Sequence, residues 1–167
     1  MDHHLAQLQQ EILAVVSGIT PERLHRRRPG KWCTAEILEH LYLTYTGTTK
    51  GFQRVMEAKR SLATLPTWRQ RARKVVIFGL NYFPSGRQAP PVARPRGLAE
   101  EKVVAEITPK ISEMDEIISA CEQSLGRGEL LDHPILGPLT AAQWRKFHLL
   151  HGRHHLKQIR GLVTENN

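Results

Sequence analysis

The sequence predicts an all-α fold: a four-helix bundle formed by a single domain that covers residues 1–167. Four segments carry apolar residues at the three- and four-residue spacing of an amphipathic helix, and no segment carries a convincing strand pattern. Residues 61–97, rich in proline and glycine, separate the second segment from the third, which predicts a long irregular crossover between helices two and three. Four apolar helix faces that must be buried together are typical of a bundle.

The first predicted helix covers residues 2–17 and ends at Gly18. Thr20 and Pro21 then begin a short helical turn, as its N-cap and its first helical residue. The apolar residues of the first helix follow the helical period closely: Leu5, Leu8, Ile12, Val15, Val16 and Ile19.

The second long helix is predicted over residues 34–60, with Thr34 as its N-cap. His40 interrupts its apolar stripe between Ile37 and Leu41. A single histidine on such a stripe is usually a core residue with satisfied hydrogen bonds, so His40 alone does not indicate a site. In the crossover that follows, residues 68–78 are predicted to form a short basic helix.

The third helix is predicted over residues 98–125, with Pro109 near its middle. The apolar stripe stays in phase across Pro109, which favours one kinked helix over two separate helices. A tight loop is expected over residues 131–139. The last helix follows this loop and begins at a capping box formed by Thr140 and Gln143.

The last helix contains four of the nine histidines of the chain. His151 and His155 lie one turn apart on the stripe that also carries Trp144 and Phe147, separated by about 6 Å along the helix axis. Two imidazoles at this spacing can share a metal ion, although the pair by itself is equally compatible with a core role. The opposite, polar face of the helix is expected to carry Arg145, Lys146, Arg153, Lys157 and Arg160.

Together, His40, His151 and His155 form a candidate metal site, because each interrupts a stripe that faces the bundle interior. Neutral imidazoles bind divalent transition metals such as Zn, Ni, Fe or Mn. Three protein ligands leave one coordination position for water or substrate, which is typical of a catalytic site rather than a structural one.

Three further residues are predicted to lie around these ligands. His148 is one turn before His151 and is expected to line the pocket without binding the metal. Glu36 is one turn before His40 and is expected to orient its ring, as carboxylates near metal ligands do. Gln158 is expected to form a hydrogen bond near the site.

Composition and charge narrow the classes of function. The two cysteines, Cys33 and Cys121, have no metal-binding spacing, so both are expected as free thiols, with Cys121 in the core and Cys33 as a minor candidate for a reactive thiol. The net charge of +8 is spread over scattered residues without an aromatic stacking motif, so nucleic acid is not an expected partner. The chain has no membrane-spanning run and no signal-peptide pattern, which favours a cytoplasmic protein with no membrane partner.

Two motifs resemble the DinB/YfiT-like family. Residues 31–41, KWCTAEILEHL, resemble the W-S/T-x-x-E-x-x-x-H-L start of the second helix in that family. Residues 147–159, FHLLHGRHHLKQI, resemble its C-terminal H-x-x-H-H-x-x-Q-I signature, and residues 133–140 also look like the family. The resemblance covers most of the chain except residues 61–97.

This resemblance implies a metal-binding four-helix bundle whose ligands, on this chain, are His40, His151 and His155. Family members with known activity include thiol-dependent transferases, and members are often homodimers. The expected function is therefore metal-dependent S-transfer from a low-molecular-weight thiol to a small-molecule substrate, with Arg or Lys from residues 61–97 contacting an anionic thiol. A metal-dependent hydrolase, and a non-catalytic stress protein that binds metal or a small ligand, are the alternatives.

Overall fold

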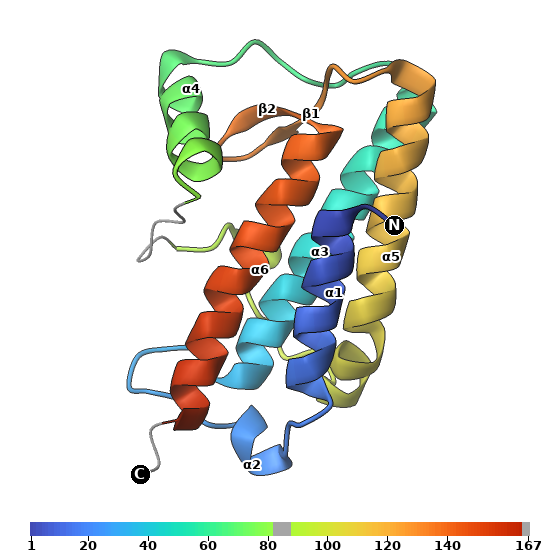
Figure 1. The fold of residues 1–167 in the computed structure, drawn as a ribbon. Coiled ribbons are helices and arrows are strands. Elements are labelled where there is room, and N and C mark those ends of the chain that lie inside the picture. The colour runs from blue at the N-terminus through green and yellow to red at the C-terminus, as the bar shows by residue number, and fades with distance from the viewer. Residues whose placement is uncertain (82–87, 165–167) are drawn as a thin grey trace.

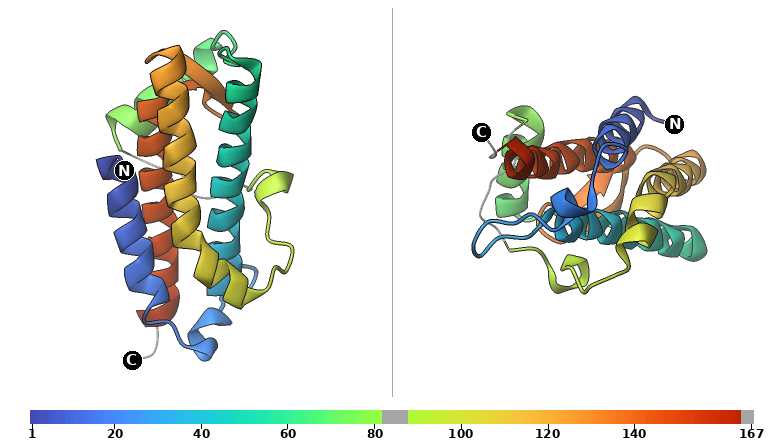
Figure 2. Two further views of the ribbon diagram at one scale, coloured as in Figure 1. Left: turned by 90° about the vertical axis from the view of Figure 1, so that its right-hand side faces the viewer. Right: turned by 90° about the horizontal axis from the view of Figure 1, so that it is seen from below.

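In a computed structural model, which describes residues 1–81 and 88–164, the chain forms a bundle of four long helices (Figure 1). These are α1 (His3–Val16), α3 (Thr34–Ala58), α5 (Glu100–Leu125) and α6 (Ala141–Thr164). Helix α1 packs against α5 and α6, and α3 packs against the same two helices, as the end-on view in Figure 2 shows. The predicted all-α bundle is therefore confirmed.

The direction of the helices explains the long crossover. Helices α1 and α6 run downward in Figure 1, whereas α3 and α5 both run upward. Because α3 and α5 are parallel neighbours, the chain must return along the length of the bundle between them. The described part of this return contains α4 (Trp68–Lys74), the π-helical turn η1 (Val75–Gly79) and the 3-10 turn η2 (Pro91–Ala93), so the predicted short basic helix is present.

Side chains mark the helix starts. Thr20 is the N-cap of the short helix α2 (Pro21–Leu24), as predicted. Helix α3 differs from the prediction, because its N-cap is Cys33 and not Thr34. The carboxylate of Glu36 accepts the backbone N–H of Cys33 at 2.7 Å, which sets the helix start one residue earlier and leaves Thr34 fully buried in the first turn.

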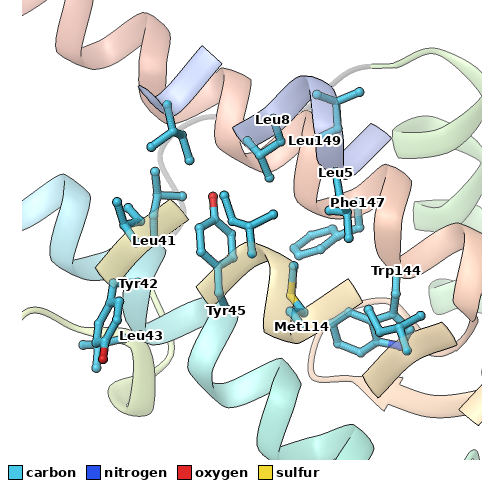
Figure 3. Packing of buried hydrophobic residues seen from close by; sticks show 14 of the residues in the cluster. Leu5, Leu8, Leu41, Tyr42, Leu43, Tyr45, Met114, Trp144, Phe147 and Leu149 are labelled. Atoms are coloured by element: carbon cyan, nitrogen blue, oxygen red, sulfur yellow. The ribbon is translucent and has the colours of Figure 1, made fainter. Parts of the chain in front are cut away.

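The apolar stripes of the four helices meet in one core. Figure 3 shows Leu8 of α1, Tyr45 of α3, Met114 of α5 and Phe147 of α6 directed toward one another. Helix α1 approaches α6 closely at Gly152, where a Cβ atom would lie 2.3 Å from Cδ1 of Leu8. A side chain at this position would force the buried Leu8 side chain to move.

Helix α5 continues through Pro109 without a break, as its in-phase stripe predicts, and its first turns lean away from the rest in Figure 2. The capping box at the start of α6 is also present, since Thr140 and Gln143 exchange backbone-to-side-chain hydrogen bonds of 3.1 and 3.2 Å. Of the helices described, none is sufficiently long and apolar to cross a membrane.

A β-hairpin replaces the tight loop expected before α6. Strand β1 (Glu129–His133) pairs antiparallel with β2 (Gly137–Thr140), with Leu131 opposite Leu139. The indole of Trp144 donates a hydrogen bond to the carbonyl oxygen of Leu131 at 3.1 Å. Strands of five and four residues, the second of which includes a proline, are too short to show a clear alternation, so packing on the bundle end decides their pairing.

Arg145 is also placed differently from the prediction. It was expected on the polar face of α6, but only 7% of it is exposed. Its guanidinium group binds Asp115 and Glu122, both on α5, at 2.9 and 2.7 Å. The carboxylates of the neighbouring helix therefore draw a charged side chain into the α5–α6 interface.

Candidate metal centre

Helices α3 and α6 bring His40, His151 and His155 to one point in the bundle interior. The Nε2 atom of His151 lies 3.3 Å from Nε2 of His40 and 3.1 Å from Nε2 of His155. The three residues are buried, with 4%, 6% and 8% of their surfaces exposed. The histidines selected by helical phase are thus the ones that the tertiary structure places together as potential metal ligands.

Hydrogen bonds at the outer ring nitrogens orient two of these rings. Nδ1 of His40 lies 2.7 Å from the carbonyl oxygen of Ala93 in η2. A carbonyl oxygen only accepts, so this nitrogen carries the ring proton and Nε2 presents a lone pair to the cluster. Nδ1 of His155 lies 2.8 Å from Oε1 of Gln158, which selects the same tautomer.

Two lone pairs therefore face the Nε2 atom of His151, which can donate a proton to only one of them. A cation at this point would satisfy both lone pairs at once. Zinc binds imidazole nitrogens at about 2.0–2.1 Å, and tetrahedral geometry then separates two ligand nitrogens by about 3.3 Å. The observed separations of 3.1 and 3.3 Å are close to this value, so the three histidines fit a divalent transition metal.

Burial keeps the three imidazoles neutral. Loss of solvation, with a smaller effect of His40, lowers the pKa of His155 to about 3. Loss of solvation also lowers the pKa of His40, and it lowers the pKa of His151 well below its usual value with added effects of the two neighbouring rings. The neutral ring is the form that binds a metal, so no proton has to leave the ligands near neutral pH.

Gln158 contacts a ring of the cluster, and His148 lies one turn before His151 on the same helix. The Gln158 side chain contacts Nδ1 of His155 through its oxygen and Nε2 of His154 through its nitrogen, at 2.8 and 3.1 Å. His148 is fully buried one turn before His151, and its Nε2 lies 3.1 Å from the hydroxyl of Thr48. The His148 side chain is therefore directed toward α3, where its ring lies beside that of Tyr45.

Glu36 does not orient His40, contrary to the prediction. Its carboxylate accepts the Cys33 backbone N–H at the start of α3 and lies 3.5 Å from Nη2 of Arg27. The carbonyl oxygen of Ala93 orients His40 instead. No side-chain pattern marks this contact, because any residue at position 93 would supply the same carbonyl group.

Two aromatic side chains lie against the rings of the triad. The ring of Trp32 lies 5.2 Å from that of His40, and Phe147 stacks on His151 with ring centres 5.3 Å apart. A divalent ion held by three neutral ligands would keep its full positive charge in this setting. Such a site favours an anionic or ionisable fourth ligand.

The two thiols stand apart from the cluster. Cys121 is fully buried, as predicted, and donates a hydrogen bond to the carbonyl oxygen of Phe52 at 3.4 Å. Cys33 is a free thiol at the N-cap of α3 with 3% of its surface exposed. This burial does not favour the reactive role considered for Cys33, because reactive thiols are accessible.

A second group of potential ligands lies at the start of α1, formed by Asp2, His3 and His4. Asp2 caps the helix by accepting the backbone N–H of His4 at 2.9 Å, and the side chain of His3 is 78% exposed. The side chains of Asp2 and His4 are each 24% exposed, and imidazole and carboxylate groups at a surface also bind divalent metals. Metal-binding experiments must separate this group from the buried triad.

The fold and family follow from comparison with known proteins. The chain is similar to the crystal structure of TT2238, described as a four-helix bundle protein, with a TM-score of 0.58 and 18% sequence identity over 95% of this chain and 94% of that one. At this identity the likeness concerns the fold alone. The comparison with curated proteins finds no match. The family described as "Protein of unknown function (DUF1569)" matches residues 2–161, and the chain belongs to this family.

Proposed function

We propose that this protein binds a divalent transition metal through His40, His151 and His155 and catalyses thiol-dependent transfer to a small molecule. The observation that carries the proposal is the convergence of three buried Nε2 atoms at the separations expected of metal ligands. The resemblance to the DinB/YfiT-like motifs points to the same residues and to thiol chemistry.

The proposed chemistry follows from the charge of the site. A bound metal ion would supply the positive charge that lowers the pKa of a thiol in the open position. The thiol proton leaves to solvent, the sulfur forms a bond to an electrophilic carbon, and the leaving group departs with its electron pair. The Ala93 carbonyl and Gln158 hold the Nδ1 protons of His40 and His155, while Trp32 and Phe147 reduce access of water.

The basic residues of the crossover divide into two groups. Arg73 and Lys74 bind the carbonyl oxygens of Ile135 and Pro138, so they hold α4 against the hairpin. Arg94 directly follows Ala93, is exposed, and donates hydrogen bonds to the Ala89 carbonyl oxygen and the Gln88 side chain. Because it lies next to the residue that contacts His40, we assign the contact with an anionic thiol to Arg94.

The first test is the metal itself. Protein purified without an affinity tag is stripped with a chelator, reloaded with Zn, Ni, Fe(II) or Mn, dialysed and subjected to elemental analysis. We expect one tightly held ion per chain in the wild type and in the control His3→Ala, and none in His40→Ala, His151→Ala or His155→Ala. Loss of the ion in His3→Ala alone would move the site to the start of α1.

The second test is the reaction. Metal-loaded protein is mixed with a panel of cellular thiols and a model electrophile, and conjugate formation is followed. We expect a rate above background that disappears in His151→Ala, with helicity retained by circular dichroism. Metal-dependent ester or amide cleavage without conjugation would identify a hydrolase instead. Tight metal binding with neither activity would identify a binding protein.

A further inference from the structure

Glu39, the residue before His40, binds the same stretch of the crossover that orients this ring. Only 4% of Glu39 is exposed, and its two carboxylate oxygens accept the backbone N–H groups of Arg96 and Gly97 at 2.9 and 3.1 Å. His40 contacts the carbonyl oxygen of Ala93 in the same stretch at 2.7 Å. Two consecutive residues of α3 thus hold residues 93–97, which run alongside this helix in Figure 2.

The conformation of Gly97 makes this contact possible. Its φ of +82° lies in the region that glycine adopts readily and other residues rarely adopt. Consecutive N–H groups can then point toward one anion, as they do toward Glu39. A Cβ atom at Gly97 would meet nothing within 4 Å, so a side chain here would act through backbone strain alone.

We propose that Glu39 is a positioning residue for His40: it fixes residues 93–97 so that the Ala93 carbonyl receives the Nδ1 proton of His40. The Nε2 lone pair of His40 is then directed toward His151. The inference rests on the proposed function only in assigning a metal ion to this lone pair.

Two physical reasons support this role. A carboxylate that accepts backbone N–H groups forms stronger hydrogen bonds than a neutral acceptor does. The turn η2 is three residues long, so it has too few hydrogen bonds of its own to fix the direction of the Ala93 carbonyl. Partners of the outer nitrogen of a metal-bound histidine orient the ring, and their loss typically lowers metal affinity about 10- to 100-fold.

The experiment compares Glu39→Gln with Glu36→Gln. Each substitution removes a carboxylate of α3 that accepts a backbone N–H, but only Glu39 binds the stretch that contacts His40. The first measurement is the tautomer of His40 in the metal-free protein, from long-range proton–nitrogen NMR spectra at about pH 8, with His40→Ala to assign the signals. The second is the dissociation constant of zinc, measured by competition with a chelator.

In the wild type and in Glu36→Gln, we expect His40 to be protonated at Nδ1 and the zinc affinities to agree within about twofold. In Glu39→Gln, the amide accepts from only one of the two N–H groups, so we expect a mixture of His40 tautomers and about tenfold weaker zinc binding. Gly97→Ala keeps the Glu39 carboxylate but strains the backbone whose N–H groups it binds. This variant should therefore also show a mixture of His40 tautomers and weaker zinc binding.

A Glu39→Gln protein that keeps the Nδ1 tautomer and the wild-type zinc affinity would overturn the inference. If Glu39→Gln fails to fold, Gly97→Ala decides by the same two measurements. A wild-type protein that binds no zinc at the triad would contradict the proposed function, and the tautomer measurement alone then decides the role of Glu39. An equal decrease in zinc affinity in Glu39→Gln and Glu36→Gln, with an unchanged His40 tautomer, would contradict the positioning role of Glu39. It would not contradict the proposed metal site.

Discussion

Two buried polar clusters in the described part of the bundle differ in how well their hydrogen-bond donors match their acceptors. In the first, the guanidinium of Arg145 donates to Asp115 at 2.9 Å, to Glu122 at 2.7 Å and to the hydroxyl of Ser119 at 2.7 Å. One cation therefore lies between two carboxylates and a hydroxyl oxygen. Each of these guanidinium nitrogens therefore has an acceptor within the cluster.

The histidine triad is incomplete by comparison. His40 and His155 present lone pairs to His151, and these three neutral rings contain no charge to balance them. Buried polar atoms are costly when they lack partners, and the metal ion proposed above would bind both converging lone pairs. The difference teaches that burial alone does not distinguish the two clusters, whereas the balance of their donors and acceptors does.

The largest effect should come from breaking the complete cluster. Arg145→Met leaves the carboxylate of Asp115 buried without its cation, and Asp115 is 4% exposed. We expect the free energy of unfolding to fall by about 3–5 kcal/mol. Urea denaturation monitored by circular dichroism measures this change. A loss below about 1 kcal/mol would show that the ion pair is not a structural requirement.

The histidine triad should respond less strongly. His151→Leu removes the ring that donates to one of the two lone pairs, so we expect the metal-free protein to lose no more than about 1–3 kcal/mol. Zinc at a hundred times its dissociation constant should stabilise the wild type by about 2.7 kcal/mol and the variant not at all. Urea denaturation with zinc and with chelator tests both values, and equal stabilisation of the two proteins would refute the triad.

The dependence of stability on pH should reveal the burial of a neutral imidazole at His133. Burial lowers the pKa of His133 to about 4, so between pH 6.5 and 4 the unfolded chain binds more protons at this residue than the folded chain does. The contribution to stability is complete above pH 6.5 and is lost as the pH falls through 4. In metal-free protein, His133→Asn should reduce the slope of stability against pH by about 1.4 kcal/mol per unit. Equal slopes, measured by urea denaturation from pH 4.5 to 6, would contradict this assignment.

The smallest effect should come from an exposed ion pair on the same helix as Arg145. Arg153 binds Glu11 of α1 at 2.7 Å, but its side chain is 43% exposed. We expect Arg153→Gln to cost less than about 1 kcal/mol, because solvent weakens such pairs. The same urea series provides the comparison with Arg145→Met. A similar cost for both variants would show that burial is not what distinguishes them.

The sequence by itself determined the four helices and the candidate ligands. Apolar residues at helical spacing mark a buried face wherever it lies, so Leu5, Leu8 and Ile12 indicated a core face without knowledge of its partner. His40, His151 and His155 stood out because each interrupts such a face. The helix capping by Thr20 and by Thr140 with Gln143 was equally readable, since it depends on neighbours in the chain.

Only the tertiary structure decided the features that depend on distant partners. Arg145 is buried because Asp115 and Glu122 face it from α5, and no pattern within α6 contains that information. The two short segments of the hairpin have only a weak preference for strand structure, so their pairing depends on packing against the bundle. The sequence pointed to Glu36 and not to the carbonyl oxygen of Ala93 as the partner of His40, because every residue has a backbone carbonyl and none marks this one. The position of this carbonyl depends on a crossover that α3 holds in place.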